Sequence, residues 1–578
     1  MTSNGISGFI WSIADLLRHD YKQHEYGGII LPLTVLRRLD CVLEKTKDKV
    51  LKKLDNLTDV DITVIEKILN NEAGFNFHNH SNFNFDKLLK DPENIAGNLH
   101  NYINGFSTNA REIIDKFEFE KQIDKLDEKN ILFLIIEKFN QIDLHPEKLT
   151  NIQMGYIFEE LIRKFAEISN ETAGEHFTPR EIIRLMVNVL FNNDRDILSK
   201  PGIVKTIYDC ACGTGGMLSV AEEYLHELNP NARLEVFGQE INEEAYAICK
   251  SDMMIKGQKS ENIKYGNSFT EDGLPNEKFD YMLANPPFGV EWKKFEKKIK
   301  DEHAEQGFGG RFGAGLPRIS DGSLLFLLHM ISKMKQDNTG SKIGIVFNGS
   351  PLFTGSAGSG ESEIRKWIIE NDMLEAIIAL PDQLFYNTGI STYIWILNNK
   401  KDDKRKGKIQ LINAVSFYKK MNRSLGNKRN EISVDDIDEI TRIYGNFKES
   451  KHCKIFNNSD FGYARITVER PLIENNKVVK DSKGNPKSDS NLRDFENMPL
   501  KKGQLEATEN DIKEYMEQEV LPHVTNAWVD HSKTKTGYEI NFTRYFYEYK
   551  SLRSLDEIRK DILNLEKETE GLLEEVLK

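Results

Sequence analysis

The first 150 residues carry apolar positions spaced three and four residues apart, which is the period of amphipathic helices. One such series runs from Phe9 to Leu17 and a second from Ile30 to Leu43, and Ile131–Ile136 is a continuous apolar run. We therefore expect residues 1–150 to form an all-helical domain. It either packs as a scaffold or uses basic residues, such as the Arg37-Arg38 pair, to contact DNA or a partner.

After one more amphipathic helix, short apolar runs alternate with helical segments. The apolar runs are Ile203–Tyr208, Arg233–Gly238, Ile263–Asn267, Phe279–Ala284, Ile343–Phe347, Leu374–Leu380 and Thr392–Leu397. Strands that alternate with helices in this way are typical of βαβ units. We predict an α/β fold for residues 151–400, with a doubly wound, mostly parallel sheet.

Beyond residue 400 the patterns are weaker. Lys400–Lys408 predicts a solvated basic linker, Asp435–Tyr444 a helix, and Phe461–Val468 a strand. Asn475–Leu492 is polar, which is typical of a loop or an irregular insertion. We expect residues 401–578 to form a C-terminal region of mixed and helical structure.

The last predicted helix, at about residues 553–578, carries a heptad seam in which three- and four-residue steps alternate. Its members are Leu555, Ile558, Ile562, Leu565, Thr569, Leu572 and Val576, of which Thr569 alone is polar. Such a seam packs against another helix, which belongs either to this chain or to a partner. We favour a helix that docks on a partner.

Composition restricts the function classes. The chain has 578 residues, a formal net charge of −13 and a mean hydropathy of −0.51, which indicates a soluble protein. No apolar run approaches the roughly 20 residues of a membrane span, and the N-terminus lacks the layout of a signal peptide. We expect a cytoplasmic protein with no membrane partner. Because proteins that hold nucleic acid alone are usually basic, action on DNA would need a local positive surface or a partner that supplies phosphate contacts.

The five cysteines are scattered and odd in number, which indicates reduced thiols in a cytosol rather than a disulfide framework. They are Cys41, Cys210, Cys212, Cys249 and Cys453. Cys210 and Cys212 form the only close pair, and no second pair stands at zinc spacing. We therefore expect no metal site.

The sequence Asn285-Pro286-Pro287-Phe288 follows directly on the predicted strand Phe279–Ala284. Proline has no N–H and a fixed φ, so the strand must end here, and ligands of open α/β sheets bind at the carboxyl ends of strands. A side-chain carbonyl, a proline carbonyl and a phenylalanine ring suit a planar group with an exocyclic amine. The same residues are also typical of a stiff loop.

A second group of residues predicts a nucleoside-bearing ligand at the same edge. Asp209 ends one strand and is followed by the turn Gly213-Thr214-Gly215, Glu240 ends the next strand, and Asn267 ends the third. The glycines allow close approach of a ligand, and an acid in the position of Glu240 can bind both ribose hydroxyls. No P-loop lysine follows, and Asp209 would repel phosphates but suits an ammonium group. S-adenosylmethionine fits these features.

Two further segments have possible roles at this edge. Thr178, Pro179 and Glu181 form a capping-box pattern that starts a helix with free N–H groups, which is also a common structural cap. The segment 307–315 holds five glycines with Phe308, Arg311 and Phe312. It is either a mobile loop or a lid that contacts DNA, with Arg311 for phosphate and an aromatic ring for stacking.

Taken in order, these motifs resemble those of the N6-adenine DNA methyltransferases with the γ arrangement, and most closely the modification subunit of type I restriction–modification systems. The resemblance also covers Phe9–Leu17 and Ile30–Leu39, which look like that subunit's N-terminal helices, and Asp382–Ile390, which looks like its late methyltransferase signature. It extends over about residues 7–400. Cys210 is a departure, because these enzymes often have proline there, and it should alter the stiffness of the turn but not the chemistry.

The resemblance implies a Rossmann-like methyltransferase sheet and a role for each motif. The resemblance implies that six residues lie next to the methionine part of S-adenosylmethionine: Glu175, His176, Phe177, Thr178, Pro179 and Arg180. For the rest of the cofactor it implies Asp209, Gly213, Thr214 and Gly215, with Glu240 on the ribose and Asn267 on the adenine. Asn285 and the Pro286 carbonyl would accept hydrogen bonds from the target amino group beside Pro287, and Phe288 would stack on the target base.

The resemblance also implies partners: double-stranded DNA, a specificity subunit shared by two modification subunits, and a restriction subunit. Three other functions stay open. The chain could be an Asn-Pro-Pro methyltransferase acting on RNA or on protein glutamine, or a stand-alone or phage-defence methyltransferase with its own target recognition. It could also be a non-catalytic scaffold that binds the cofactor as an assembly signal.

Overall fold

The structure, a computed structural model, describes residues 3–57, 60–169, 178–192, 194, 198–386, 388–475, 477–548 and 554–576. The chain divides into a large unit, residues 1–540, and a small C-terminal unit, residues 541–578. Among the predicted site residues, Glu175, His176 and Phe177 lie outside the described residues.

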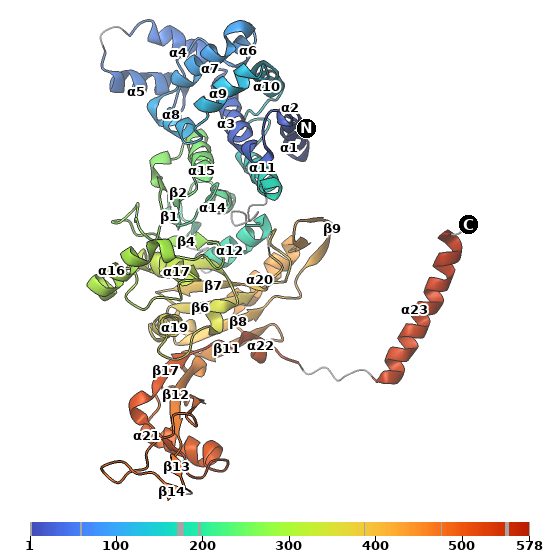
Figure 1. The fold of residues 1–578 in the computed structure, drawn as a ribbon. Helices are drawn as coiled ribbons and strands as arrows, with labels where there is room; N and C mark the ends of the chain where they lie inside the picture. Colours follow the sequence, from blue (N-terminus) through green and yellow to red (C-terminus); the bar gives the residue numbers. More distant parts are fainter. Residues whose placement is uncertain are drawn as a thin grey trace. The chain divides into compact units, whose positions relative to one another are not determined.

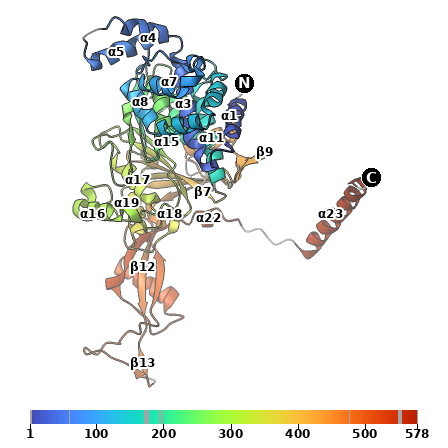
Figure 2. The same ribbon diagram turned by 45° about the horizontal axis from the view of Figure 1, so that its top comes forward.

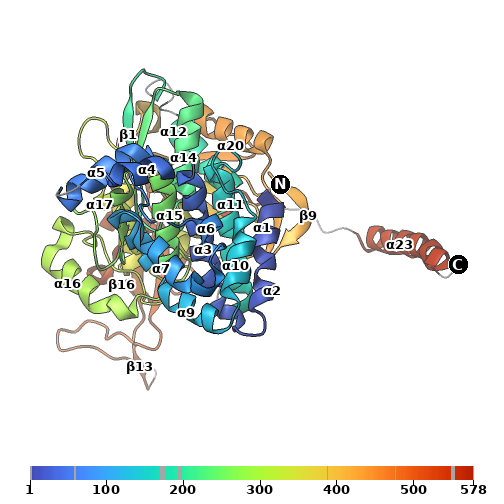
Figure 3. The same ribbon diagram turned by 90° about the horizontal axis from the view of Figure 1, so that it is seen from above.

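The N-terminal part of the large unit is helical, as predicted. Its helices are α1 (Ser3–Ser12), α2 (Ala14–Leu17), α3 (Gly27–Leu43), α4 (Lys47–Leu54), α5 (Ile62–Ala73), α6 (Phe85–Leu88), α7 (Ile95–Asn104), α8 (Thr108–Asp115), α9 (Glu120–Glu128), α10 (Leu132–Asn140) and α11 (Asn151–Ser169). Figure 3 shows α1, α3, α10 and α11 gathered together. Their apolar faces form one buried cluster, which also includes Ile248 and Met254 from the following α/β part.

The Arg37-Arg38 pair of α3 lies inside this helical part. Arg37 donates a hydrogen bond to the carbonyl of Ile142 at 2.9 Å. Arg38 is buried and donates to the carbonyl of Leu149 at 2.9 Å and to Asn151 Oδ1 at 2.7 Å. Buried guanidinium groups require such acceptors, so the pair holds the chain around α11 against α3. The interpretation of these arginines as DNA or partner contacts is wrong.

A nine-stranded sheet forms the centre of the large unit (Figure 1). In spatial order its strands are β11 (Cys453–Asn457), β8 (Lys408–Asn413), β6 (Leu374–Ala379), β7 (Thr392–Asn398), β5 (Lys342–Asn348), β4 (Tyr281–Ala284), β1 (Val204–Asp209), β2 (Arg233–Glu240) and β3 (Ile263–Tyr265). The strands from β3 to β5 pair in parallel, β7 is antiparallel to both of its neighbours, and β6 pairs in parallel with β8. The carboxyl ends of β1, β2, β4, β6 and β8 therefore meet at one edge. The predicted mostly parallel sheet is confirmed.

Helices cover both faces of this sheet. Those of one face share a hydrophobic cluster with strand residues such as Ile207, and they are α12 (Arg180–Asn192), α14 (Gly216–Leu228), α15 (Glu243–Ile255) and α20 (Val434–Asn446). Successive side chains of a strand point to opposite faces. Tyr208, the neighbour of Ile207, contacts His329 of α17 (Ser323–Ser332), with ring centroids 5.9 Å apart. α17 therefore covers the other face, and the remaining helices before β6 are α16 (Glu296–Gln306), α18 (Ser350–Phe353) and α19 (Gly360–Glu370).

The sheet continues beyond residue 400, because β8 and β11 extend it past β6. The predicted domain boundary at residue 400 therefore falls between two strands of one sheet. The predicted solvated linker is wrong for Arg405, whose guanidinium is fully buried 4.4 Å from the ring centroids of Tyr444 and Phe447. It also lies 3.6 Å from Oε1 of the buried Glu375, whose charge requires such a partner.

A smaller sheet completes the large unit. β12 (Gly462–Glu469), the predicted strand, pairs with β15 (Asp494–Pro499), β16 (Trp528–Val529) and β17 (Lys535–Tyr538), and α21 (Glu509–Tyr515) packs on it. Two hairpins also occur, β9 (Lys419–Leu425) with β10 (Lys428–Glu431), and β13 (Ile473–Glu474) with β14 (Lys477–Val478) (Figure 2). β14 lies within the segment predicted as a polar loop. The C-terminal unit contains α22 (Phe542–Tyr545) and α23 (Leu555–Val576).

The buried Arg405–Glu375 pair should be important for stability. Arg405→Ala leaves the Glu375 carboxylate without its cation and is expected to lower the free energy of unfolding by about 3–5 kcal/mol. Lys404→Ala, at an exposed neighbouring position, is the matched control and should change it by no more than about 0.5 kcal/mol. Chemical denaturation followed by circular dichroism measures both, and equal effects of the two variants would refute the importance of the pair.

Candidate functional site

A cavity of about 170 Å³ lies at the carboxyl edge of the sheet, where β1, β2 and β4 end. Eight residues predicted from the sequence lie in its wall: Thr178, Asp209, Gly213, Thr214, Glu240, Asn267, Asn285 and Pro287. They come from separate segments of the chain and meet because parallel strands end at the same edge of a sheet. Pro179, Arg180, Gly215, Pro286 and Phe288 are chain neighbours of these residues.

The glycine turn after β1 depends on two left-handed residues. Gly213 has φ 53° and Gly215 has φ 84°, values that favour glycine. A Cβ on Gly215 would also stand 2.8 Å from Cys249 Sγ of α15. The turn leads directly into α14 at Gly216, whose backbone therefore borders the cavity.

Glu240 fixes this turn to the end of β2. Its Oε2 accepts a hydrogen bond from the Gly213 N–H at 2.8 Å. Its Oε1 accepts from the N–H groups of Ile241 and Asn242, at 2.9 and 2.7 Å. Oε2, which accepts only one of these bonds, has a further lone pair, so Glu240 can shape the cavity and still accept a hydrogen bond from a ligand.

Asp209 is a buried acid at the centre of the wall. Its Oδ1 accepts a hydrogen bond from the Ala211 N–H at 3.0 Å. Burial, with a smaller contribution from the nearby Glu240 carboxylate, raises the pKa of Asp209 to about 8. A cation in the cavity would offset both causes and favour the ionised form.

Asn267 lies two residues beyond β3, and its side chain is partly used inside the protein. Its Oδ1 accepts a hydrogen bond from the Phe269 N–H at 2.8 Å. The neighbouring Ser268 hydroxyl donates to the carbonyl of Cys210 at 2.6 Å, which joins this segment to the glycine turn. The cavity wall at this point therefore consists of the turns after β1 and β3, which a hydrogen bond joins.

Asn285 stands at the end of β4, where Pro286 ends the strand. Its Oδ1 is buried and has no hydrogen-bond partner among the described residues. An unpaired buried acceptor costs about 1–3 kcal/mol, so this atom is suited to a donor that the protein itself does not supply. The Phe288 ring lies edge-on to that of Phe385, with centroids 6.3 Å apart and planes at 70°.

Comparison with known proteins agrees with this geometry. The model of the N-6 DNA methylase family matches residues 150–479, more than half of the chain. A model named HsdM N-terminal domain matches residues 6–139.

The chain belongs to the N-6 DNA methylase family.

Relatives of this methylase include the type I restriction enzyme MjaIX methylase subunit of Methanocaldococcus jannaschii, 27% identical over 81% of this chain and 82% of that protein. The type I restriction enzyme HindI methylase subunit of Haemophilus influenzae is 32% identical over 50% of this chain and 59% of that protein. A type I methyltransferase subunit from Streptococcus thermophilus has the same fold, with a TM-score of 0.61, 22% identity and coverage of 80% of this chain and 97% of that chain.

This methylase is therefore a modification subunit of the type I restriction–modification class. Its reaction is methyl transfer to N6 of adenine in DNA, on the fold of S-adenosylmethionine-dependent enzymes.

Arg180 of the methylase is used for internal contacts. It donates a hydrogen bond to Glu159 Oε1 of α11 at 2.8 Å, and it lies 4.6 Å from the ring centroid of Tyr156. Glu159 is itself in the cavity wall, and burial raises its pKa. The helix at this point, α12, begins at Arg180, later than the predicted start at Thr178.

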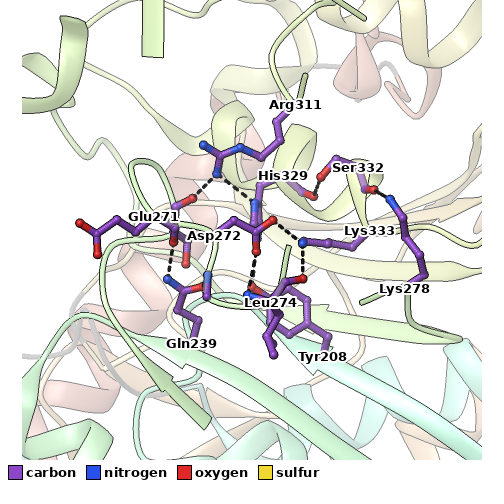
Figure 4. A network of polar contacts seen from close by, with 12 residues as sticks. Tyr208, Gln239, Glu271, Asp272, Leu274, Lys278, Arg311, His329, Ser332 and Lys333 are labelled. Atoms are coloured by element: carbon purple, nitrogen blue, oxygen red, sulfur yellow. Dashed lines mark hydrogen bonds and ion pairs between the residues drawn. The ribbon is translucent and has the colours of Figure 1, made fainter. Parts of the chain in front are cut away.

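Arg311 anchors the glycine-rich segment 307–315 to the turn that follows β3, and Figure 4 shows its guanidinium group above His329. It donates hydrogen bonds to the carbonyls of Ser268 and Phe269, at 2.6 and 2.8 Å. Phe312, the next residue, is fully buried. The interpretation of Arg311 as an exposed phosphate ligand is therefore wrong, and this residue supports the turn that follows Asn267.

His329 connects Arg311 to the end of β1. Arg311 lies 3.3 Å from His329 Nδ1, and His329 Nε2 lies 2.9 Å from the Tyr208 hydroxyl (Figure 4). A guanidinium can only donate, so Nδ1 accepts and Nε2 carries the proton that is donated to Tyr208. Burial, followed by the charge of Arg311, lowers the pKa of His329 to about 3, so the ring is neutral.

Sequence reasoning missed the apolar part of the wall. Ile241, Phe269 and Phe326 all line the cavity, and Ile241 is 54% exposed although it is a large apolar residue. The position of Ile241 directly after Glu240 in the sequence was a signal that it could line the cavity. Phe326 lies in an apolar helix in which most other residues are also buried, so no feature of the residue pattern selects it.

The raised pKa of Asp209 predicts a pH-dependent stability difference. The folded protein holds a proton on Asp209 that the unfolded chain has released, so stability falls as pH rises from the ordinary pKa of 3.8 to about 8. Asp209→Asn keeps the acceptor for Ala211 without the charge. Without cofactor, its Tm relative to the wild type should therefore rise across this range and level off above about pH 8. Differential scanning fluorimetry measures this, and a pH-independent difference would refute the assignment.

Proposed function

We propose that the methylase binds S-adenosylmethionine in this cavity and methylates an adenine that has been flipped out of duplex DNA. The unpaired, buried Oδ1 of Asn285 is the observation that carries this proposal. An adenine amino group is a donor of the required kind, and it is accessible only when the base leaves the duplex.

The wall of the cavity fits the cofactor. Its described lining residues include the acids Glu159, Asp209 and Glu240 and no lysine or arginine, which favours a cationic ligand over a phosphate. Ile241 and Phe269 supply apolar surface for a base. When bound, S-adenosylmethionine supplies a methyl group on a cationic sulfur. We assign Asp209 to its ammonium group, Glu240 to its ribose and Asn267 to the edge of its adenine.

Asn285 and Pro286 act on the target amino group. The nitrogen lone pair of adenine is delocalised into its ring, which makes it a poor nucleophile. Hydrogen bonds from the amino group to Asn285 Oδ1 and to the Pro286 carbonyl favour a tetrahedral nitrogen with its lone pair free. The two acceptors also hold the nitrogen in place for transfer, and such positioning contributes much of the rate. Phe288 stacks on the flipped base, supported by Phe385.

We propose that the partners are duplex DNA, a specificity subunit and a restriction subunit, with two modification subunits for each specificity subunit. The names of the relatives, methylase subunits of type I restriction enzymes, support an assembly of this kind. In the C-terminal unit, Leu555 is 85% and Ile562 61% exposed, which supports α23 as a partner-docking helix. The side chains of Thr569, Leu572 and Val576 lie outside the described residues.

We place the protein in the cytoplasm, where its DNA substrate would be found. All five cysteines are free and buried, which supports a reducing compartment. None of the described helices is long and apolar enough to cross a membrane.

Asn285→Ala should remove methyl transfer but leave cofactor binding unchanged. The variant loses the acceptor for the target amino group and is expected to methylate DNA at least about 10²-fold more slowly. The control is Asn371→Ala. Asn371 is an exposed residue directly after α19, and this variant should retain full activity.

The measurement is transfer of labelled methyl groups to duplex DNA, RNA or protein, with calorimetry for the cofactor. The complex with the specificity subunit is used. Near-wild-type methylation by Asn285→Ala would refute the assigned role, and transfer to RNA or protein alone would refute the substrate.

A further inference from the structure

The hairpin β9–β10 projects from the edge of the central sheet that carries the cavity. It belongs to neither large sheet, and we call residues 419–431 the basic hairpin. Because β8 runs parallel to β6, the chain leaves β8 at the edge where β1 and β4 also end. Figure 1 shows β9 extending outward beside α20. The hairpin is therefore on the catalytic side of the sheet.

Four cations of the basic hairpin are exposed. Lys419, Lys420, Arg423 and Arg429 have no ion-pair partner within the described part of the chain. Glu431 is the single acid in the hairpin. In a chain with a net charge of −13, this is a local positive surface of the kind that action on DNA requires.

The fifth cation, Lys428, anchors the hairpin. It is buried, and its ammonium group contacts Glu181 of α12 and donates to the carbonyl of Leu384 at 3.1 Å. The N–H of Arg429 donates to the carbonyl of Gln383 at 2.9 Å. The four exposed cations are thus held at a fixed place relative to the segment after β6.

That segment leads directly to the proposed base pocket. Phe385, beside the two anchoring carbonyls, packs edge-on against Phe288, with ring centroids 6.3 Å apart. Phe288 belongs to the same turn as Asn285. The basic hairpin is therefore connected to the pocket in two steps. Its backbone and Lys428 are hydrogen-bonded to the segment after β6, and Phe385 of that segment packs on Phe288.

We propose that the basic hairpin binds the phosphate backbone of duplex DNA beside the target adenine. This inference rests on the proposed function, because it requires that DNA lies at this edge. Lysine and arginine contacts to phosphate position a duplex without reading its sequence. The seven residues of β9 extend over about 20 Å, the length of about six base-pair steps. These phosphate contacts would hold the duplex in place while its target base is in the pocket.

A solvated turn is the first competing explanation, and an acidic protein surface is the second. A solvated turn does not require a buried lysine and two backbone contacts to fix its position. An acidic partner would be attracted by the same charges, but the anchoring places them next to the pocket where the DNA substrate must lie. These observations favour DNA.

The test uses a variant that carries Lys419→Gln, Lys420→Gln, Arg423→Gln and Arg429→Gln, in complex with the specificity subunit. Fluorescence anisotropy gives its Kd over a salt series for a duplex that contains the site methylated by the wild type. Each lost phosphate contact lowers the slope of log Kd against log salt by about 0.9, so a reduction of about two to four is expected. Affinity should fall at least about tenfold at moderate salt. Cofactor affinity should be unchanged, because the hairpin does not line the cofactor cavity.

A matched control variant removes the same number of positive charges at a different hairpin. Lys477, Lys480, Lys483 and Lys487 are exposed on and beside β14. Replacing all four with glutamine should leave the salt slope at the wild-type value. A reduction of equal size in this control would show a general charge effect and would overturn the proposal.

The remaining outcomes are also distinct. A wild-type slope in the hairpin variant, when the wild type methylates DNA, would overturn the hairpin proposal alone. Loss of the specificity subunit from the variant complex, seen by mass photometry, would make the hairpin a protein-docking surface instead. A wild type that methylates no DNA would refute the proposed function and this inference together.

A second measurement needs no variant. Chemical acetylation of the wild-type complex, read by mass spectrometry, compares Lys419 and Lys420 with Lys477 and Lys480. Cognate duplex should protect the first pair and not the second, and S-adenosylmethionine alone should protect neither. Equal labelling of the first pair with and without DNA would overturn the proposal.

Discussion

The rest of the site depends on the carboxylate of Glu240. Three backbone N–H groups, from Gly213, Ile241 and Asn242, donate to its two oxygens. Hydrogen bonds to an ionised acceptor are stronger than neutral ones. One side chain thereby joins the glycine turn, the end of β2 and the start of α15, and this fixes the wall of the cavity that Asp209 and Asn285 also line. The acid therefore supports the fold and also lines the cavity.

The order of strands and helices could be predicted from the sequence because each element carries its own periodic signal. The edge that holds the cavity could be predicted as well, since proline after Asn285 and glycine after Asp209 mark where strands end. The reversed direction of β7 could not, because an apolar run has the same pattern in either direction. The apolar wall around Phe326 was also invisible, since wall and core use the same residue types.

Charged residues were the main source of error. A contact role was left open for Arg37 and Arg311, and a solvated linker was predicted at Arg405. Arg37 and Arg311 are half-buried and Arg405 is fully buried, and each donates to a carbonyl that lies far away along the chain. One acceptor of Arg37, the carbonyl of Ile142, is 105 positions away along the chain. A buried cation is recognisable only when its distant partner is known, whereas an exposed one, such as Arg423, needs no partner at all. Sequence alone does not separate the two.

The pKa of Asp209, about 8, has a consequence for the cofactor cavity. At neutral pH the acid is mostly neutral while the cavity contains no cation. In the proposed binding mode, an ammonium group beside Asp209 favours its ionised form, so the proton of Asp209 leaves as the positive ligand arrives. Binding in this mode exchanges one positive charge for another. In the empty cavity below about pH 8 the proton on Asp209 limits its repulsion with Glu240. Under the proposed function, protons therefore compete with the positively charged methyl donor for this cavity.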